Sequence, residues 1–172
     1  MNLQSTDFEL FQLPMQFAQP RELIDARWKE LQRQAHPDKF AAQGAAAQRL
    51  AMQWSVRINE AYQRLKDPLA RASYLCELHG APIRAENNTA MPPAFLVQQM
   101  EWREALEDAV TMAQLEQLAS ETRVAENAQL AVIARALDAD KDHVRAANEV
   151  RSLMFIQRFA QEVEARIDLL AP

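Results

Sequence analysis

Glycine is almost missing from this sequence, and its scarcity limits the possible folds more than any other feature. Only two of the 172 residues are glycine. Tight hairpin turns between β-strands depend on glycine, so a sheet protein with many such turns is disfavoured. With two glycines, the sequence cannot contain the glycine-rich phosphate-binding loops of P-loop and dinucleotide-binding proteins. The sequence therefore predicts an all-α protein and excludes the enzyme classes that need those loops.

Composition excludes several further classes. Hydrophobic residues make up 49% of the chain and charged residues 25%, as in an ordinary soluble globular protein. The single cysteine, Cys76, rules out a disulfide framework and a thiolate metal cluster held by this chain alone. The three histidines lie far apart in sequence. We expect no metal site and no cofactor.

The N-terminal segment and the charge distribution indicate in which compartment the protein acts and which partners it does not bind. The segment MNLQSTDFELFQL has neither the basic nor the apolar region of a signal peptide, and no apolar run is long enough for a membrane span. Residues 1–80 carry a net charge of +1 and residues 81–172 carry −6. An acidic half disfavours nucleic acid, because neutralising phosphates requires clustered Lys and Arg. We expect a cytoplasmic protein that binds neither membranes nor nucleic acid.

Prolines and apolar periodicity divide the first 80 residues into helices. Pro20 opens a helix that should end at Ala35, because His36 precedes Pro37 and avoids the α conformation. A second helix follows the AAQGAA stretch, and a third begins at Asp67-Pro68 and ends before Gly80. Together they predict an antiparallel helical hairpin with short flanking helices. The core faces of the first two helices are Ile24, Trp28, Leu31 and Ala35, and then Leu50, Trp54, Ile58, Ala61 and Leu65.

Residues 81–93 have turn formers at both ends and no periodicity, so we interpret them as a linker. The remaining residues, 94–172, show three amphipathic helical patterns with short connections, which predicts an antiparallel three-helix bundle. The second pattern covers about residues 112–137, and the third follows the acidic break DADKD. The predicted core faces are Phe95, Trp102, Leu106, Ala109 and Ala113; Leu115, Leu118, Thr122 and Ala125; and Leu153, Ile156, Ala160, Val163, Ile167 and Leu170.

The tripeptide His36-Pro37-Asp38, followed by Lys39 and Phe40, falls in the loop between the two antiparallel helices of the hairpin. Taken alone, it has a structural interpretation. A proline that ends the helix would leave His36 at the negative end of the helix dipole. A functional interpretation needs the surrounding sequence.

The first 80 residues resemble a J-domain, the co-chaperone module that stimulates ATP hydrolysis by DnaK-class chaperones. The similarity lies in DFELFQLP, LQRQAHPDKF and INEAYQRLKDPLARASYL and in the spacing between them. The segments AFLVQQMEWREAL and EVRSLMFIQRF resemble the C-terminal domain of the HscB family. That family consists of J-type co-chaperones of iron–sulfur cluster biogenesis, which bring the scaffold IscU to the chaperone HscA. The resemblance implies a J-domain in residues 1–80, a linker in 81–93 and a three-helix scaffold-binding domain in 94–172.

The resemblance also implies which residues of the first domain meet the chaperone. In the tripeptide, proline restricts the loop and the carboxylate of Asp38 suits an arginine on the partner. Basic residues of the preceding helix would form a docking face, although acidic residues interrupt it and an ordinary solvated face remains the alternative. The complete predicted chaperone-binding set is His36, Pro37, Asp38, Lys39, Arg27, Lys29 and Arg33.

A helical projection predicts a second surface independently of the family. With Phe95, Trp102 and Leu106 facing the core, Leu96 and Met100 point about 100–140° away from it. Apolar side chains outside the core face and rimmed by charge suggest a protein-binding patch, whereas a wide core face is the alternative. The resemblance implies a scaffold-binding set of Leu96, Val97, Met100, Glu101, Arg103, Glu104 and Phe155.

Other functions remain as alternatives. An enzyme could use His36 and Asp38 as an acid–base pair, but no third group orients them and an exposed loop offers no dry pocket. A helical adaptor would carry the tripeptide by accident, and a general J-domain protein would serve another client. We therefore expect a co-chaperone that is not an enzyme, with an HscA-type chaperone and an IscU-type scaffold as partners. Cys76 is expected to be a packed residue.

Overall fold

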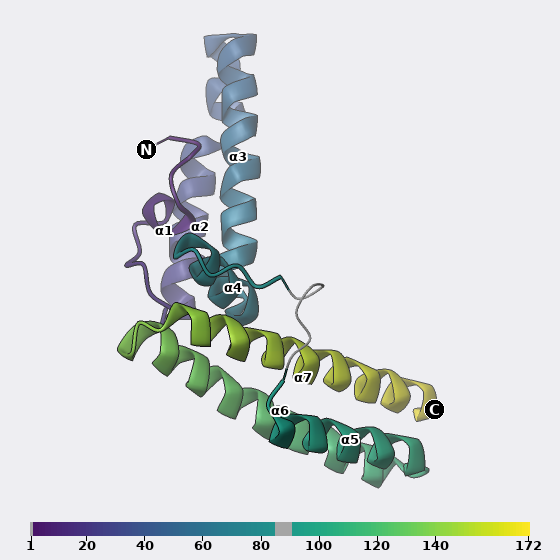
Figure 1. Ribbon diagram of the computed structural model, residues 1–172. Helices are drawn as coiled ribbons and strands as arrows, with labels where there is room; N and C mark the ends of the chain where they lie inside the picture. Colours follow the sequence, from purple (N-terminus) through teal and green to yellow (C-terminus); the bar gives the residue numbers. More distant parts are fainter. Residues whose placement is uncertain (1, 85–90) are drawn as a thin grey trace. The chain divides into compact units, whose positions relative to one another are not determined.

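The computed structural model describes residues 2–84 and 91–172, and every regular element in these ranges is helical (Figure 1). This confirms the predicted all-α class. The chain divides into two compact units, Met1–Leu75 and Cys76–Pro172. The elements are α1 (Asp7–Leu10), α2 (Arg21–Ala35), the 3₁₀-helix η1 (Pro37–Gln43), α3 (Ala45–Lys66), α4 (Pro68–Leu78), α5 (Pro93–Asp108), α6 (Met112–Ala134), the π-helix η2 (Arg135–Ala139) and α7 (His143–Leu170).

The first unit is built on the predicted hairpin of α2 and α3. The indole of Trp28 donates a hydrogen bond to Asn59, and the hydroxyl of Ser55 donates one to the carbonyl of Ala35. Residue numbers therefore increase along α2 as they decrease along α3, so the two helices are antiparallel. Helix α2 ends at Ala35 because His36 is extended, with φ −63° and ψ 127°, as expected before a proline.

A buried carboxylate connects three helices of the first unit. Asp7 opens α1 and is completely buried. It accepts two hydrogen bonds from Arg64, of 2.7 and 2.9 Å, and lies 2.8 Å from Nη1 of Arg57 in an ion pair. Its backbone N–H donates to the hydroxyl of Tyr74. A buried charge requires such partners, and here they join α1 to α3 and α4.

One end of the hairpin is less well packed than the periodicity of α3 predicts. Ile58 and Leu65 are buried as expected, but Leu50 is 50% exposed and Trp54 is half-buried. The prediction of Leu50 as a core residue is wrong because α2 ends opposite Ser55, so the first turns of α3 extend past it. An apolar cavity of about 350 Å³ remains there, between α2, η1 and α3.

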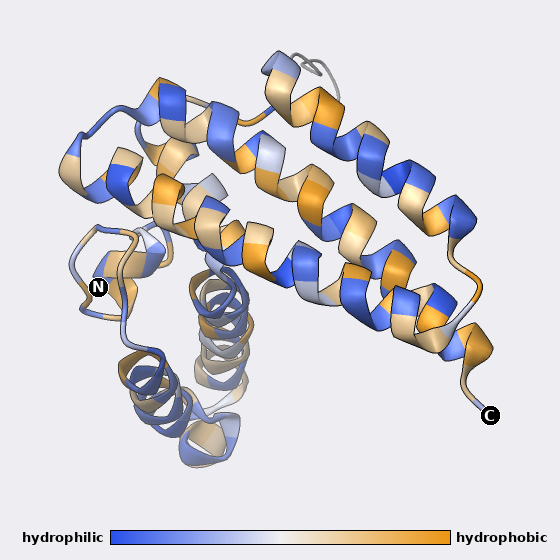
Figure 2. Cartoon of the chain, turned by 90° about the horizontal axis from the view of Figure 1, so that it is seen from below, coloured by the Kyte–Doolittle hydropathy of each residue, from blue (hydrophilic) through white to orange (hydrophobic). Residues whose placement is uncertain are grey.

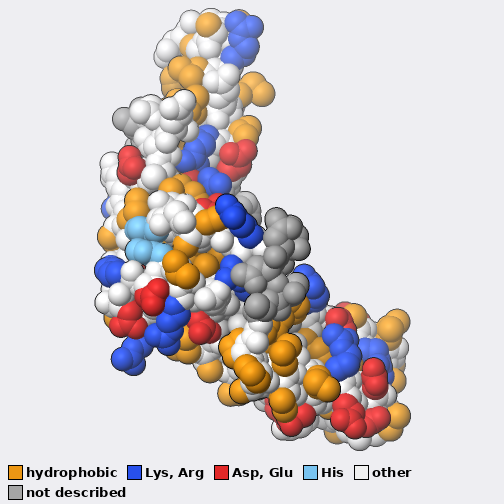
Figure 3. Space-filling model, viewed as in Figure 1, with side chains coloured by type: hydrophobic (Ala, Val, Ile, Leu, Met, Phe, Trp, Pro, Cys, Tyr) orange, Lys and Arg blue, Asp and Glu red, His pale blue; other side chains and the backbone are white. Residues whose placement is uncertain are grey.

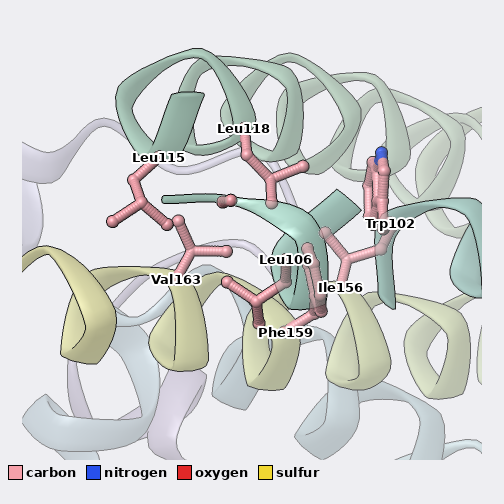
Figure 4. Packing of buried hydrophobic residues seen from close by; sticks show 8 residues of the cluster. Trp102, Leu106, Leu115, Leu118, Ile156, Phe159 and Val163 are labelled. Atoms are coloured by element: carbon pink, nitrogen blue, oxygen red, sulfur yellow. The ribbon is translucent and has the colours of Figure 1, made fainter. Parts of the chain in front are cut away.

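The second unit contains the predicted three-helix bundle of α5, α6 and α7. Each helix carries hydrophobic and hydrophilic residues along its length (Figure 2). Its core contains Trp102, whose ring stacks on Phe159 with centroids 5.4 Å apart. Figure 4 shows side chains from all three helices pointing toward one another in this core: Trp102, Leu106, Leu115, Leu118, Ile156, Phe159 and Val163.

The helix ends of this unit differ from the predicted stripes at two positions, Ala113 and Leu170. Helix α5 stops at Asp108, so Ala109 caps it and is buried in the core as predicted, whereas Ala113 belongs to α6, where it is exposed. The reason is a capping box, in which Thr111 and Gln114 satisfy each other's backbone N–H groups and begin a new helix. Leu170, in the last turn of α7, is half exposed rather than buried.

The start of the predicted linker is packed within the second unit. Ala81 and Ile83 are buried, and the carbonyl of Ile83 accepts a hydrogen bond from the buried guanidinium of Arg151. Residues 85–90 lie outside the described ranges. The domain limits 1–80, 81–93 and 94–172 stay a prediction.

Candidate functional site

The loop between α2 and α3 presents the tripeptide on the surface of the first unit. Pro37 occupies the first position of η1, which is pre-organised for a helical start. The side chain of Asp38 is 93% exposed and that of His36 is 58% exposed. The two polar groups therefore face solvent at the end of a rigid hairpin.

The geometry within the tripeptide determines which ring nitrogen of His36 is free to contact a partner. Its Nδ1 accepts a hydrogen bond of 3.2 Å from the backbone N–H of Asp38 and lies 3.6 Å from the Asp38 carboxylate. A neutral ring whose Nδ1 accepts carries its proton on Nε2. The loop thus presents one N–H donor and one carboxylate to a partner.

The basic residues predicted to bind the chaperone with this loop differ in how far their side chains are exposed or engaged with other residues. Arg33 is held by Glu30 through hydrogen bonds of 3.0 and 2.6 Å, and this pair lowers the pKa of Glu30 to about 2. Arg27 is half-buried, and its Nε has no hydrogen-bond partner among the described residues. Lys29 and Lys39 are exposed. The structure therefore leaves the two lysines as the more available cations.

The predicted apolar strip of the second unit is on the surface. Leu96, Val97 and Met100 are 46%, 53% and 71% exposed, although they share α5 with buried Trp102 and Leu106. Figure 3 shows hydrophobic side chains gathered over this part of the molecule, near the beginning of α5. The alternative of a wide core face does not hold for these three residues.

The other four predicted residues of this surface are carried by α5 and α7. Arg103 of α5 forms a two-bond ion pair with Glu162 of α7, and its guanidinium also lies over the ring of Phe159. Phe155 is half-buried on α7. Glu101 and Glu104 are exposed on α5. Together with Leu96, Val97 and Met100, these four residues form what we name the α5–α7 surface: Leu96, Val97, Met100, Glu101, Arg103, Glu104 and Phe155.

One pair of residues was missed by the sequence analysis. The rings of His79 and His143 are stacked, with centroids 3.9 Å apart and an angle of 6° between their planes. Burial, and then the neighbouring His79, lower the pKa of His143. The two residues are 64 positions apart in sequence and neither lies in a recognisable motif, so no sequence signal could have paired them.

Other chemical sites find little support in the described ranges. No three His, Cys, Asp or Glu side chains there are grouped so that they could hold a metal ion. Cys76 is buried, and burial raises the pKa of its thiol to about 11. None of the helices in residues 2–84 and 91–172 has the length and apolar character needed to cross a bilayer.

Comparison with known proteins identifies the family. The HSCB C-terminal oligomerisation domain matches residues 91–164. The "Co-chaperone protein HscB homolog" of Burkholderia thailandensis is 50% identical over 173 residues, which cover 99% of this chain and 98% of that protein. Its counterpart in Burkholderia multivorans is also 50% identical, with the same coverage.

Solved structures agree with the sequence relatives. Chaperone HscB from Vibrio cholerae has 36% sequence identity and a TM-score of 0.83, covering 97% of this chain and 100% of that one. Human co-chaperone HscB, 23% identical, has the same fold with a TM-score of 0.89, covering 96% of this chain and 84% of that one. With both units matched over nearly their whole length, this chain belongs to the HscB family of co-chaperones.

Proposed function

We propose that this protein stimulates the ATPase of an HscA-type, DnaK-class chaperone and delivers an IscU-type scaffold protein to it, aiding the maturation of iron–sulfur proteins. The observation that carries the proposal is the exposed Asp38 carboxylate in the loop of an antiparallel hairpin, in a member of the HscB family. The protein would act by binding alone, in the cytoplasm, without a cofactor and without a reaction of its own.

The loop has the properties that chaperone activation requires. An exposed carboxylate on a short, proline-containing turn can meet an arginine of the partner with little loss of conformational entropy. Arg27, Lys29, Arg33 and Lys39 would complete the docking face, with the two lysines contributing most because they are the least engaged within the chain. Long-range attraction from such cations accelerates association.

The α5–α7 surface has the properties of a protein-binding site. A contiguous apolar group with a charged rim is unusual on a soluble protein unless a partner covers it. A co-chaperone that holds a client on one unit and activates the chaperone with the other makes their encounter effectively intramolecular, which raises the local concentration of the client. This links the two surfaces in one function.

An acid–base enzyme built on His36 and Asp38 has less support. Both side chains are more than half exposed, and such exposure leaves water to compete with any proton transfer between them. A general J-domain protein that serves another client remains the second candidate, because it would use the same loop but a different cargo.

The decisive experiment measures ATP hydrolysis by the chaperone with and without scaffold. Asp38→Ala should abolish stimulation while far-UV circular dichroism stays unchanged, because the side chain is exposed. Glu60→Ala, which removes an exposed carboxylate from α3, serves as the matched control. Stimulation that survives in a folded Asp38→Ala protein would contradict the proposed activation.

The scaffold half of the proposal needs a separate variant. Substituting Leu96 and Met100 by Ser should remove scaffold binding and the additional stimulation that scaffold brings, while stimulation by the co-chaperone alone remains. The bundle should stay folded, because both side chains are exposed and the Trp102 core is untouched. Scaffold binding at wild-type affinity in this variant would show that the α5–α7 surface is not the binding site. Only a wild-type protein that fails to bind the scaffold would leave the general J-domain function as the remaining candidate.

A further inference from the structure

The two helices that form the α5–α7 surface run parallel, and this fixes which residues are level with each other. Trp102 stacks on Phe159, and Arg166, two turns further along α7, donates hydrogen bonds to the carbonyls of Leu106 and Ala109. Residue numbers therefore increase together along α5 and α7. One turn earlier, Phe155 is level with the segment of α5 that carries the apolar strip.

The order of side chains around α5 follows from the ion pair of Arg103 with Glu162, which marks the side of α5 that faces α7. At about 100° per residue, Leu96 lies about 20° and Met100 about 60° from Arg103. Glu104 follows at about 100° and Glu101 at about 160°. Leu96 and Met100 are therefore next to α7, whereas Glu104 and Glu101 lie at the far edge together with Val97, at about 120° from Arg103.

The opposite edge of the surface carries a guanidinium outside the predicted set. Arg158 is exposed on α7, one turn beyond Phe155, and its guanidinium carbon lies 5.6 Å from the centroid of the Phe155 ring. Over residues 2–84 and 91–172 the structure gives Arg158 no carboxylate partner, whereas Arg103 is engaged with Glu162. Arg158 is thus the available cation of this surface, and its guanidinium lies over an aromatic ring at a distance where cation–π attraction acts.

We infer that Arg158 is a partner-binding residue of the α5–α7 surface and that it orients the bound protein. The surface is apolar in the middle, negative at the outer edge of α5 and positive at the edge of α7. The partner segment that fits this surface carries apolar side chains with a carboxylate on one side and a cation on the other. The carboxylate faces Arg158, and the cation faces Glu101 and Glu104. Opposite charges at the two edges allow one orientation and oppose the reversed one.

This inference rests on the proposed scaffold binding, so its experiment uses the IscU-type scaffold protein as the probe. Affinity is measured by calorimetry at low and at high salt for wild type, Arg158→Glu and Arg158→Lys. Arg158→Glu should weaken binding about tenfold at low salt, and Arg158→Lys about twofold, because lysine keeps the charge but loses the planar stacking. The effect of Arg158→Glu should shrink at high salt, since exposed charges are screened.

A matched control separates a local contact from a change in net charge. Arg123 is an exposed arginine on α6, and Arg123→Glu changes the net charge by the same amount. It should leave the affinity unchanged, and an equal loss in both variants would overturn the inference. A charge reversal on the scaffold that restores binding to Arg158→Glu would identify the facing carboxylate.

The possible failures can be told apart. If Leu96→Ser with Met100→Ser abolishes scaffold binding but Arg158→Glu binds as wild type, the role of Arg158 is refuted and the proposed function stands. If wild-type protein does not bind the scaffold at all, both are refuted. Unchanged circular dichroism of the Arg158 variants, expected for an exposed side chain, keeps either outcome interpretable.

Discussion

Replacing the buried carboxylate of the first unit tests whether Asp7 holds it together. Asp7→Asn keeps the size of the side chain but removes the charge that Arg64 and Arg57 share. Breaking a buried ion pair by removing one partner costs about 3–5 kcal/mol, since the other charge is left uncompensated. The side chain of Arg64 is 44% exposed and can partly return to water, and Arg57, although only 14% exposed, keeps hydrogen bonds to the carbonyls of Leu3 and Ser5. We therefore expect the lower end, about 3 kcal/mol. That is a large part of the free energy of unfolding of a small domain.

Urea unfolding followed by tryptophan fluorescence can measure this change in the first unit alone. In a Trp102→Phe background the remaining indoles, Trp28 and Trp54, both belong to that unit. With a slope of about 1 kcal/mol per molar urea, the midpoint should fall by about 3 M. Arg33→Gln, which removes an exposed ion pair, should barely move the midpoint, because exposed pairs contribute little to stability. A shift of the Asp7→Asn midpoint below about 0.5 M at unchanged slope would refute the reasoning.

Two further predictions concern titration. Burial raises the pKa of the Cys76 thiol to about 11. Ellman's reagent at pH 8 should therefore label the folded protein about a hundredfold more slowly than the urea-unfolded protein. Equal labelling rates would contradict the burial of Cys76. Because Arg33 lowers the pKa of Glu30 to about 2, the contribution of this pair is complete above the usual pKa of 4.5 and is lost as the pH falls toward 2. Arg33→Gln should return the NMR-detected midpoint of Glu30 toward 4.5, and a midpoint that stays in place would show that another group is responsible.

Features governed by local sequence were predictable. Helix α2 ends at Ala35 because a proline two positions later acts on its immediate neighbours, and α4 ends before Gly80, which has a positive φ of 78°. The exposure of Leu96 and Met100 followed from helical periodicity, because only one face of α5 can pack against the bundle.

Features that depend on distant parts of the chain were not predictable. Asp7 sits in an apolar segment, and nothing there indicates that arginines 50 and 57 positions later would surround it. Leu50 has the spacing of a core residue, and its exposure depends on where the neighbouring helix ends. The pairing of Arg158 with Phe155 is local, but helical spacing alone does not distinguish it from the solvated face that an isolated arginine usually indicates; the position of the guanidinium over the ring does.

The burial of Cys76 determines whether its thiol can compete with the ligands of an iron–sulfur cluster. An iron–sulfur cluster is held by cysteine thiolates, and a cysteine of a neighbouring protein can compete for the metal only as an accessible thiolate. The one thiol in this sequence is enclosed in the protein and stays protonated at neutral pH. With an IscU-type scaffold as cargo, the protein would therefore carry the cluster-loaded form without its own cysteine displacing a cluster ligand.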